Sequence, residues 1–338
     1  MQTINITAAD TLFFRDGRPF TMGEDTHADG LFPPPPSVLY GALRSAYMAK
    51  KLSTDTVADL IKETSLLTIK GLALVIENFG IHFPLPKDLV VPKVKDKRYK
   101  ALPLDYTVAS NLSSSLTPKT LKNRKKDKMQ DGDFYLKRSA MIDYLNRDED
   151  EFPCRLLPIE REMKVGIGRN NETHIATDGM LYRAAMQRPK EVSFAVQFDN
   201  LSLDTEGVLQ LGGERKVAHF QSFNYQEVEI PTIEGCEFKI YLATPAIFKA
   251  GWQPTDILEE GCTIQAAAIG KPLHLGGFDI DKKTPKAMLQ AVPAGSVYYV
   301  KAKDEAQAQR IIKKIEAQGS ISEFYPEQGF GIAFIGKI

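Results

Sequence analysis

The sequence predicts an α+β fold in which antiparallel strands and hairpins come before a strand–helix–strand unit at the C-terminal end. Apolar and polar residues alternate through VGIGRNNETHIATDGMLYRA and EVSFAVQF, which is typical of strands with one buried face. SVYYVKA is followed by an apolar stripe at helical spacing, between a capping Asp304 and Gly319, and GFGIAFIGKI closes the chain. A strand, a helix and a strand after an antiparallel run are typical of a ferredoxin-like sandwich.

The elements before the hairpins are predicted in order. Residues 3–15 are expected to be strand-rich, and RDGRPF follows as a turn because Asp16-Gly17 permits a tight reversal. Four prolines at 33–36 force an extended entry, and SVLYGALRSAYMAKK then has the apolar spacing of a helix. On that helix Tyr40 and Arg44 are four residues apart and therefore share a face. A second helix is expected over residues 55–66.

Length and composition predict a folded protein of two domains. The chain has 338 residues, of which 43% are hydrophobic and 25% charged, and its formal net charge is zero; this excludes a wholly disordered chain. Three distant cysteines exclude a disulfide scaffold, and without an apolar run of membrane length or a secretory signal we expect a cytoplasmic protein. We expect the domains to span residues 1–229 and 230–338.

Charge is concentrated in one segment. Between Lys87 and Lys128 there are twelve basic and four acidic residues, so this segment carries +8. It includes the low-complexity stretch NLSSSLTPKT, and we expect much of residues 87–130 to be mobile. Two interpretations stay open: a solvated loop, or an arm that faces an anion such as RNA phosphate.

No motif indicates catalysis. The five histidines show neither HExxH nor metal-ligand spacing, and the chain lacks a GxxxxGK[ST] loop and a GxSxG elbow. We therefore predict no catalytic residue, no metal site and no cofactor.

What recurs is glycine beside basic residues. Glycine lets backbone N–H groups approach a phosphate, and an adjacent arginine or lysine adds a charged hydrogen bond. Each such site alone can be an ordinary turn; together they favour an anionic polymer. The candidates are Gly166, Gly168 and Arg169; Gly212, Gly213, Arg215 and Lys216; Lys271; and Gly329 and Gly331. QGFGIAFI at 328–335 also matches the Gly-aromatic-Gly core of an RNA-recognition strand, but lacks its leading base and later aromatics.

Eight blocks in collinear order carry a family resemblance: LFFRDGRPF, LFPPPPSVLYGALRSA, VGIGRNNETHIATDGMLY, LGGERK, ATPAIFKAGWQP, KPLHLGGFD, VPAGSVY and GFGIAFIG. They cover the chain except for residues 85–150. In these blocks the chain resembles the third-subunit family of the Cmr complex, the type III-B CRISPR effector, within the RAMP superfamily.

The resemblance implies two ferredoxin-like (RRM-like) domains with inserted loops and a projecting β-hairpin, here about residues 163–183. It implies a non-catalytic scaffold for antiviral defence that grips the 5′ tag of crRNA and docks the large polymerase-like subunit. The hairpin is expected to reach target RNA beside adjacent RAMP backbone subunits. On this sequence the resemblance adds Arg15 and Arg18 of the first turn to the RNA-binding candidates. Arg44 is added too, because an arginine can both pair with phosphate and stack on a base. A structural ion pair is the alternative for Arg44, and we expect Glu214 to orient Arg215 or to cap a turn.

Two enzyme classes remain as alternatives. A metal-independent endoribonuclease that processes CRISPR repeat RNA would use His27 as general acid or base, with Arg15 or Lys271 as the cationic stabiliser. A small-molecule enzyme would use GGERK as a phosphate nest.

Overall fold

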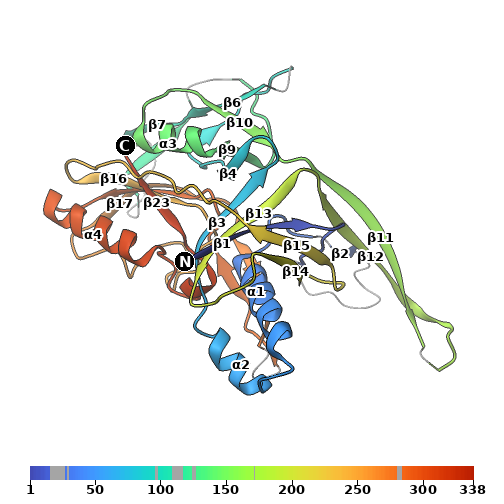
Figure 1. Ribbon diagram of the computed structural model, residues 1–338. Coiled ribbons are helices and arrows are strands. Elements are labelled where there is room, and N and C mark those ends of the chain that lie inside the picture. The colour runs from blue at the N-terminus through green and yellow to red at the C-terminus, as the bar shows by residue number, and fades with distance from the viewer. Residues whose placement is uncertain are drawn as a thin grey trace.

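The computed structural model describes residues 1–15, 27–28, 30–95, 98–108, 117–123, 127–170, 172–279 and 284–338. Most of the molecule is built on two antiparallel sheets, one of ten strands and one of four, with helices against them (Figure 1). Arg18 lies outside the described residues, and the side chain of His27 is likewise not described, so both predictions stay predictions.

The ten-stranded sheet takes its strands from the first two thirds of the chain. Its order is β14 (Glu206–Gln210), β15 (Val217–Ser222), β1 (Gln2–Ala8), β13 (Val192–Asp199), β3 (Thr68–Ile76), β4 (Gly80–Pro84), β9 (Phe134–Lys137), β10 (Phe152–Leu156), β6 (Tyr99–Pro103) and β5 (Leu89–Val90). Numbered along the chain, the four strands β15-β1-β13-β3 have the order 4-1-3-2. The helices α1 (Pro36–Lys51) and α2 (Val57–Thr64) lie between β1 and β3 in the chain. Leu39 and Leu43 of α1 pack with Ile4, Ile6 and Phe194 in the core of this sheet.

The four-stranded sheet repeats this strand order near the C-terminus. Its order is β17 (Thr263–Ala268), β22 (Val297–Lys301), β16 (Glu237–Leu242) and β23 (Ala333–Gly336), which is again 4-1-3-2 read from β23. Helix α4 (Glu305–Gln318) follows β22, and the 3-10 helix η1 (Pro326–Gln328) comes before β23. The Asp304 carboxylate caps α4 by accepting the N–H of Gln307 at 2.8 Å, as the sequence predicts, and Gly319 ends the helix at φ 68°. The predicted apolar stripe of Ala308, Ile311, Ile312 and Ile315 is buried against the sheet.

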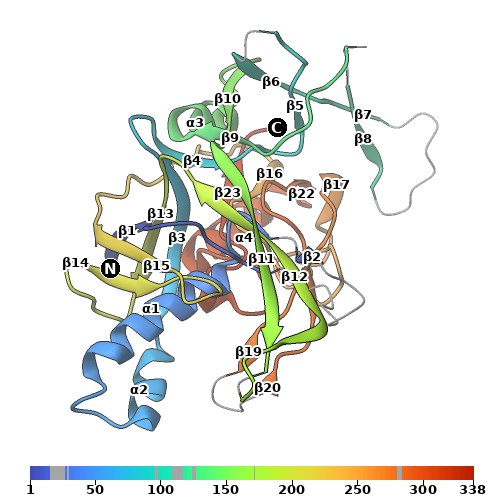
Figure 2. The ribbon, with the colours of Figure 1, turned by 90° about the vertical axis from the view of Figure 1, so that its right-hand side faces the viewer.

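Long connections supply the remaining elements. Strands β11 (Ile159–Arg169) and β12 (Ala176–Pro189) form a hairpin that projects from the body, and β2 (His27–Ala28) pairs with β12 in parallel (Figure 1). A shorter hairpin, β7 (Asp105–Val108) and β8 (Lys119–Lys122), is seen at the upper right of Figure 2, and Tyr106 of β7 stacks on Tyr299 of the four-stranded sheet. The others are α3 (Arg138–Asn146), β18 (Leu273–Leu275), β19 (Phe278–Asp279), β20 (Thr284–Pro285) and β21 (Leu289–Ala291).

The basic segment forms strands in its described part. Its described part contains β5, β6, β7 and β8, and β6 pairs with β10, whose register joins Ala101 to Phe152. This pairing spans about fifty residues of chain, so no local pattern in the sequence signals it.

The two sheets are joined through buried polar contacts. The hydroxyls of Tyr144 and Tyr299 each donate to the carboxylate of Asp88 at 2.8 Å, and the Tyr241 hydroxyl donates to the carbonyl of Pro84 at 2.6 Å. Asp88 is 2% exposed. Tyr299 and Tyr241 belong to the four-stranded sheet, and their rings lie in the same core as the ten-stranded sheet. The two units therefore share one interior.

Lys239 lies in this joint as a buried amine. Its Nζ donates to the carbonyl of Tyr144 at 2.9 Å and lies 3.4 Å from the centre of that ring. Burial lowers the pKa of Lys239 to about 8, although the Asp88 carboxylate opposes this shift.

We expect Lys239 to contribute a rise in the free energy of unfolding between pH 8 and pH 10, which appears as the difference between wild type and Lys239→Met. In that window the unfolded chain holds a proton on Lys239 that the folded chain has released, so raising the pH removes a cost of folding. The gain is about 2 kcal/mol by linkage. In the upper part of this window the buried tyrosines oppose the rise in both proteins, because burial raises the pKa of Tyr144 and Tyr241 and the folded chain keeps protons that the unfolded chain loses. Urea titrations between pH 8 and pH 10 measure the free energy of unfolding of wild type, Lys239→Met and the surface control Lys313→Met. A rise of equal size in Lys239→Met would contradict the assignment.

Candidate nucleic-acid interface

The projecting hairpin has a defined tip. The Asn170 side-chain oxygen accepts the N–H groups of Glu172 and Thr173 at 2.8 and 3.1 Å, and the Asn170 N–H donates to the carbonyl of Ile175 at 3.0 Å. An asparagine that bonds its own following backbone stabilises a reversal. The hairpin and its turn at Asn170 are therefore present where the sequence predicts them, with strands longer than the expected 163–183.

One face of the hairpin combines apolar and cationic side chains. Side chains alternate along β11, so Arg161, Met163, Val165, Ile167 and Arg169 share a face. Met163 is 51% exposed, and Val165 and Ile167 are each 58% exposed. Opposite Val165 on β12 stands Arg183, which is also exposed. The arginines of this face make no ion pair with a described residue, so their donors are available to a ligand.

The root of the hairpin is held by an ion-pair network. It joins β11 and β12 to the turn after β1 and to the loop between β14 and β15, with Arg188 and Lys216 both paired to Asp10 at 3.0 and 3.1 Å. The backbone N–H of Thr11, followed by Lys216 and Arg188, lowers the pKa of Asp10. The further pairs are Arg188 with Glu162, and Lys164 with Glu214. Glu214 thus pairs across to the hairpin, where the sequence predicted a partner in Arg215 or a turn cap.

The GGERK loop lies beside this root. Gly212 has φ +79°, and a Cβ there would lie 2.6 Å from the carbonyl oxygen of Phe13. The Gly213 N–H donates to the same carbonyl at 2.8 Å, so it is not available to a phosphate. Lys216 donates to Asp10 and, at 2.9 Å, to the Thr11 hydroxyl. Arg215 is exposed and has no ion-pair partner in the described part of the chain, which leaves it as the loop's best contact for an anion.

Arg44 has structural partners. Its Nε donates to the Thr64 hydroxyl at 3.0 Å and a terminal nitrogen donates to the carbonyl of Ile61 at 3.2 Å, which fastens α1 to α2. Its guanidinium lies 5.5 Å from the ring centre of Tyr40, on the shared face that the sequence predicts. Two donors of Arg44 are therefore already used within the helix pair. Their acceptors are a hydroxyl and a carbonyl, whereas the alternative interpretation predicted an ion pair with an acidic residue.

The C-terminal glycines require a correction. Gly329 and Gly331 are buried, and their N–H groups donate to the carbonyls of Pro326 and Pro245 at 3.0 and 2.7 Å. Added Cβ atoms would lie 2.8 Å from the Ile69 side chain and 2.4 Å from the Ser322 nitrogen. These glycines permit close packing of η1 and the following turn against β3, and they offer no surface to RNA. We withdraw them from the candidate interface.

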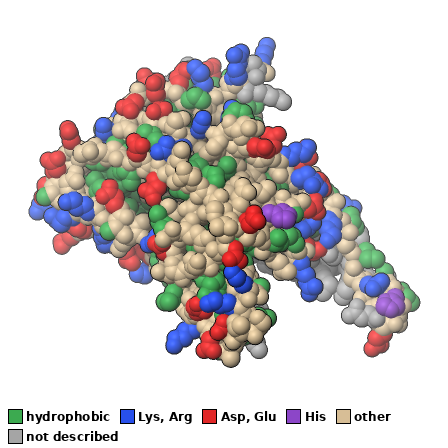
Figure 3. Space-filling model, viewed as in Figure 1, with side chains coloured by type: hydrophobic (Ala, Val, Ile, Leu, Met, Phe, Trp, Pro, Cys, Tyr) green, Lys and Arg blue, Asp and Glu red, His purple; other side chains and the backbone are tan. Residues whose placement is uncertain are grey.

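The remaining candidates are dispersed. Arg15 is exposed, and its backbone bridges Gly30. Gly166 and Gly168 are half-buried on β11, and Lys271 is exposed just before β18. Figure 3 shows basic side chains interspersed with acidic ones around the hairpin root, and no single basic patch on this face. The structure thus places Arg169 beside the tip of the hairpin and Arg215 and Lys216 beside its root, and leaves Arg44 and the terminal glycines elsewhere.

Sequence reasoning missed the residues that position this arm. Asp10, Glu162, Lys164 and Arg188 come from three separate segments, and only the alternation of charges along β11 could have pointed to them. No group of three or more His, Cys, Asp or Glu side chains within the described ranges is placed to hold a metal ion. None of the described helices has both the length and the apolar character to cross a membrane.

Comparison with known proteins places the chain. The family model described as CRISPR-associated protein (Cas_Cmr3) matches residues 4–338. The structures titled "Cryo-EM structure of the Type III-B Cmr-beta bound to cognate target RNA and AMPPnP, state 1" and "Cryo-EM structure of the Type III-B Cmr-beta bound to cognate target RNA" each contain a chain with a similar fold. Each match has a TM-score of 0.54 and 19% identity, and covers 94% of this chain and 89% of the other. A search of curated proteins finds no match. Because the family model spans nearly the whole length, the chain belongs to the Cas_Cmr3 family of CRISPR-associated proteins.

Proposed function

We propose that this chain is a non-catalytic, RNA-binding scaffold subunit of a type III-B CRISPR effector, acting in antiviral defence in the cytoplasm. Family membership supports the assignment, and so does the fold it shares with a chain in assemblies bound to target RNA. In this proposal it grips the 5′ tag of crRNA, docks the large polymerase-like subunit, and contacts adjacent RAMP backbone subunits.

The proposal also covers the architecture. We infer that the two sheets with 4-1-3-2 strand order are two ferredoxin-like units, divided near residue 230. Each has a helical connection on one side, α1 and α2 in the first unit and α4 in the second. The segment between β3 and β13 is then an insertion that includes the hairpin.

The observation that carries the RNA-binding part is the exposed face of the hairpin. Arg161, Arg169 and Arg183 stand beside exposed Met163, Val165 and Ile167 on an arm that extends beyond the body (Figure 1). Arginine pairs with phosphate and stacks on bases, and apolar side chains pack against base faces. A rigid root is required if such an arm is to hold a strand in one register, and the ion pairs of Asp10 supply it.

Charge reversal at Arg169 and Arg215 tests the RNA contact. Each substitution is expected to weaken crRNA binding about tenfold and to reduce the slope of log affinity against log salt by about 0.7 per lost phosphate contact. Filter binding over a salt series, with the effector assembled around each variant, measures both quantities. Lys313→Glu on α4, on the opposite side of the molecule from the hairpin, is the matched control. Slopes equal to wild type in both variants would contradict this placement of RNA.

A further inference from the structure

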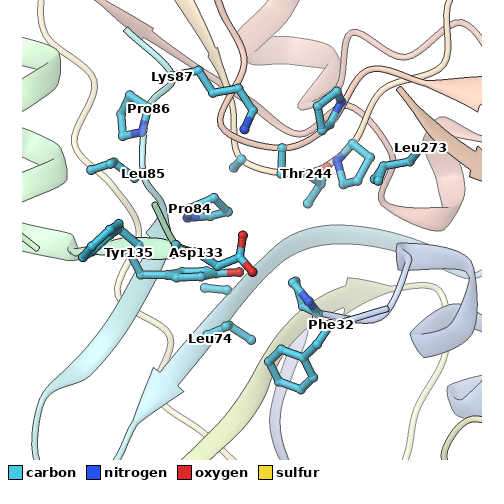
Figure 4. Close-up of a pocket in the computed structure, with 18 of the residues that line it drawn as sticks. Phe32, Leu74, Pro84, Leu85, Pro86, Lys87, Asp133, Tyr135, Thr244 and Leu273 are labelled. Atoms are coloured by element: carbon cyan, nitrogen blue, oxygen red, sulfur yellow. The ribbon is translucent and has the colours of Figure 1, made fainter. Parts of the chain in front are cut away.

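A cavity lies between the two units of the molecule. Its volume is about 530 Å³, and it is lined by the segment that enters α1, by β3 and β4, and by loops next to the four-stranded sheet (Figure 4). This size is within the range of pockets that enclose a small ligand or a large side chain. None of the glycines and arginines named above as RNA-binding candidates lines it, but Lys87, the first residue of the basic segment, does.

The walls are rich in proline. Pro33–Pro36, Pro84, Pro86, Pro245 and Pro293 line the cavity, together with apolar side chains such as Phe32 and Leu74. Proline has a fixed φ and no N–H, so such walls are stiff and offer few backbone donors. A stiff pocket loses little conformational entropy when it is filled, which favours a flat, apolar occupant.

Three polar groups face this apolar space. Tyr135 is 4% exposed, and its hydroxyl makes no hydrogen bond to any residue in the described part of the chain. Figure 4 shows Tyr135 and the Asp133 carboxylate directed into the cavity above Phe32, with Lys87 entering from the other wall. The Tyr135 hydroxyl is not among the fully buried atoms without a partner, so water reaches it in the cavity. An occupant that has an acceptor, such as a phenol oxygen, would replace that water.

The charges of the lining select among occupants. The described lining residues include one lysine, Lys87, no arginine, and two acids, Asp131 and Asp133. Phosphate sites are built from arginine, lysine and backbone N–H groups, so carboxylates and prolines disfavour an RNA strand here. A free cation would be opposed by Lys87. A neutral aromatic group with one hydrogen-bond donor can donate to a carboxylate and present its ring face to the Lys87 ammonium.

We propose that this cavity receives a tyrosine or tryptophan side chain from a protein partner, with its O–H or N–H donating to Asp133. Such residues fill pockets at the centre of protein interfaces, because one end is apolar and the other can hydrogen-bond. The inference rests on the proposed function, since an effector subunit has protein neighbours, and it locates one anchor of that assembly away from the RNA-binding arm.

The isolated full chain tests the pocket without RNA. N-acetyltryptophanamide and N-acetyltyrosinamide are titrated by NMR, with N-acetylphenylalaninamide as the probe that lacks the donor and AMP as the nucleic-acid probe. We expect the two donors to bind at least fivefold more tightly than the phenylalanine probe, and this preference to be lost in Asp133→Ala with unchanged thermal unfolding. No preference, a preference kept in Asp133→Ala, or tighter binding of AMP overturns the proposal.

The assembled effector tests the occupant. p-Benzoylphenylalanine replaces Leu273, which lines the cavity, and is cross-linked by light. Capture of a partner peptide that contains tyrosine or tryptophan is expected; capture of RNA, or of a peptide that contains neither residue, overturns the proposal. If the Arg169 and Arg215 variants keep the wild-type salt slope while the two cavity tests give the expected results, the placement of RNA is contradicted and the aromatic anchor in the cavity is supported.

Discussion

Replacing Asp88 with alanine is expected to lower the free energy of unfolding by about 3 to 5 kcal/mol. Its carboxylate accepts the hydroxyls of Tyr144 on α3 and Tyr299 on β22, each at 2.8 Å, inside the shared core. Alanine leaves both hydroxyls without an acceptor where water cannot replace it, and Lys239 loses the negative charge that opposes the shift of its pKa.

Urea unfolding of purified variants measures this effect. Tyr299→Phe removes one donor and keeps the carboxylate bonded to Tyr144, so it should cost about 1.5 to 3 kcal/mol, less than Asp88→Ala. Glu149→Ala, an exposed acid of the same chain, should stay within about 0.5 kcal/mol of wild type. If Asp88→Ala matched Glu149→Ala, the carboxylate would not join the two units.

Local patterns predicted the elements whose causes are local. The prolines before α1, the cap at Asp304, the stripe of α4 and the reversal at Asn170 depend on residues within a few positions of one another. Each was predicted, although α1 begins at Pro36, the last of the four prolines that were predicted to be extended. The Cas_Cmr3 assignment was likewise predictable, because the collinear blocks extend along most of the chain.

Burial between distant segments was not predictable in the same way. Asp88 counts as an acid in a basic run, yet two tyrosines separated from it by 56 and 211 positions make it part of the core. Nothing near Asp88 in the sequence distinguishes it from a solvated carboxylate. The ion-pair network at Asp10 and the cavity beside Tyr135 likewise depend on contacts between segments far apart in the chain.

Glycine shows the same ambiguity in the candidate interface. A glycine that lets RNA approach the backbone and a glycine that lets another strand approach it look identical in a sequence. The surroundings differ in the structure: Gly213 faces an exposed loop at the hairpin root, whereas Gly331 is enclosed by the protein. Only the second kind must lower stability when a Cβ is added.

Gly331→Ala is therefore expected to destabilise the fold by about 3 kcal/mol without a direct effect on RNA. Its φ of +72° is strained for alanine, and the Cβ would lie 2.4 Å from the backbone nitrogen of Ser322, which cannot move without breaking the turn. Gly319→Ala separates the two causes, because its φ is +68° and nothing lies within 4 Å of the added Cβ. It should cost only about 1 to 2 kcal/mol, the price of the left-handed backbone alone.

Urea unfolding and filter binding of the folded fraction distinguish structure from recognition at this position. The hydrogen bonds of Gly331, from its N–H to Pro245 and from Ile321 to its carbonyl, leave neither backbone group for a nucleotide. Folded Gly331→Ala should therefore bind crRNA with the wild-type salt dependence, while its unfolding midpoint falls well below that of Gly319→Ala. Wild-type stability combined with weakened RNA binding would restore the C-terminal glycines to the interface and would mean that the turn opens when RNA binds.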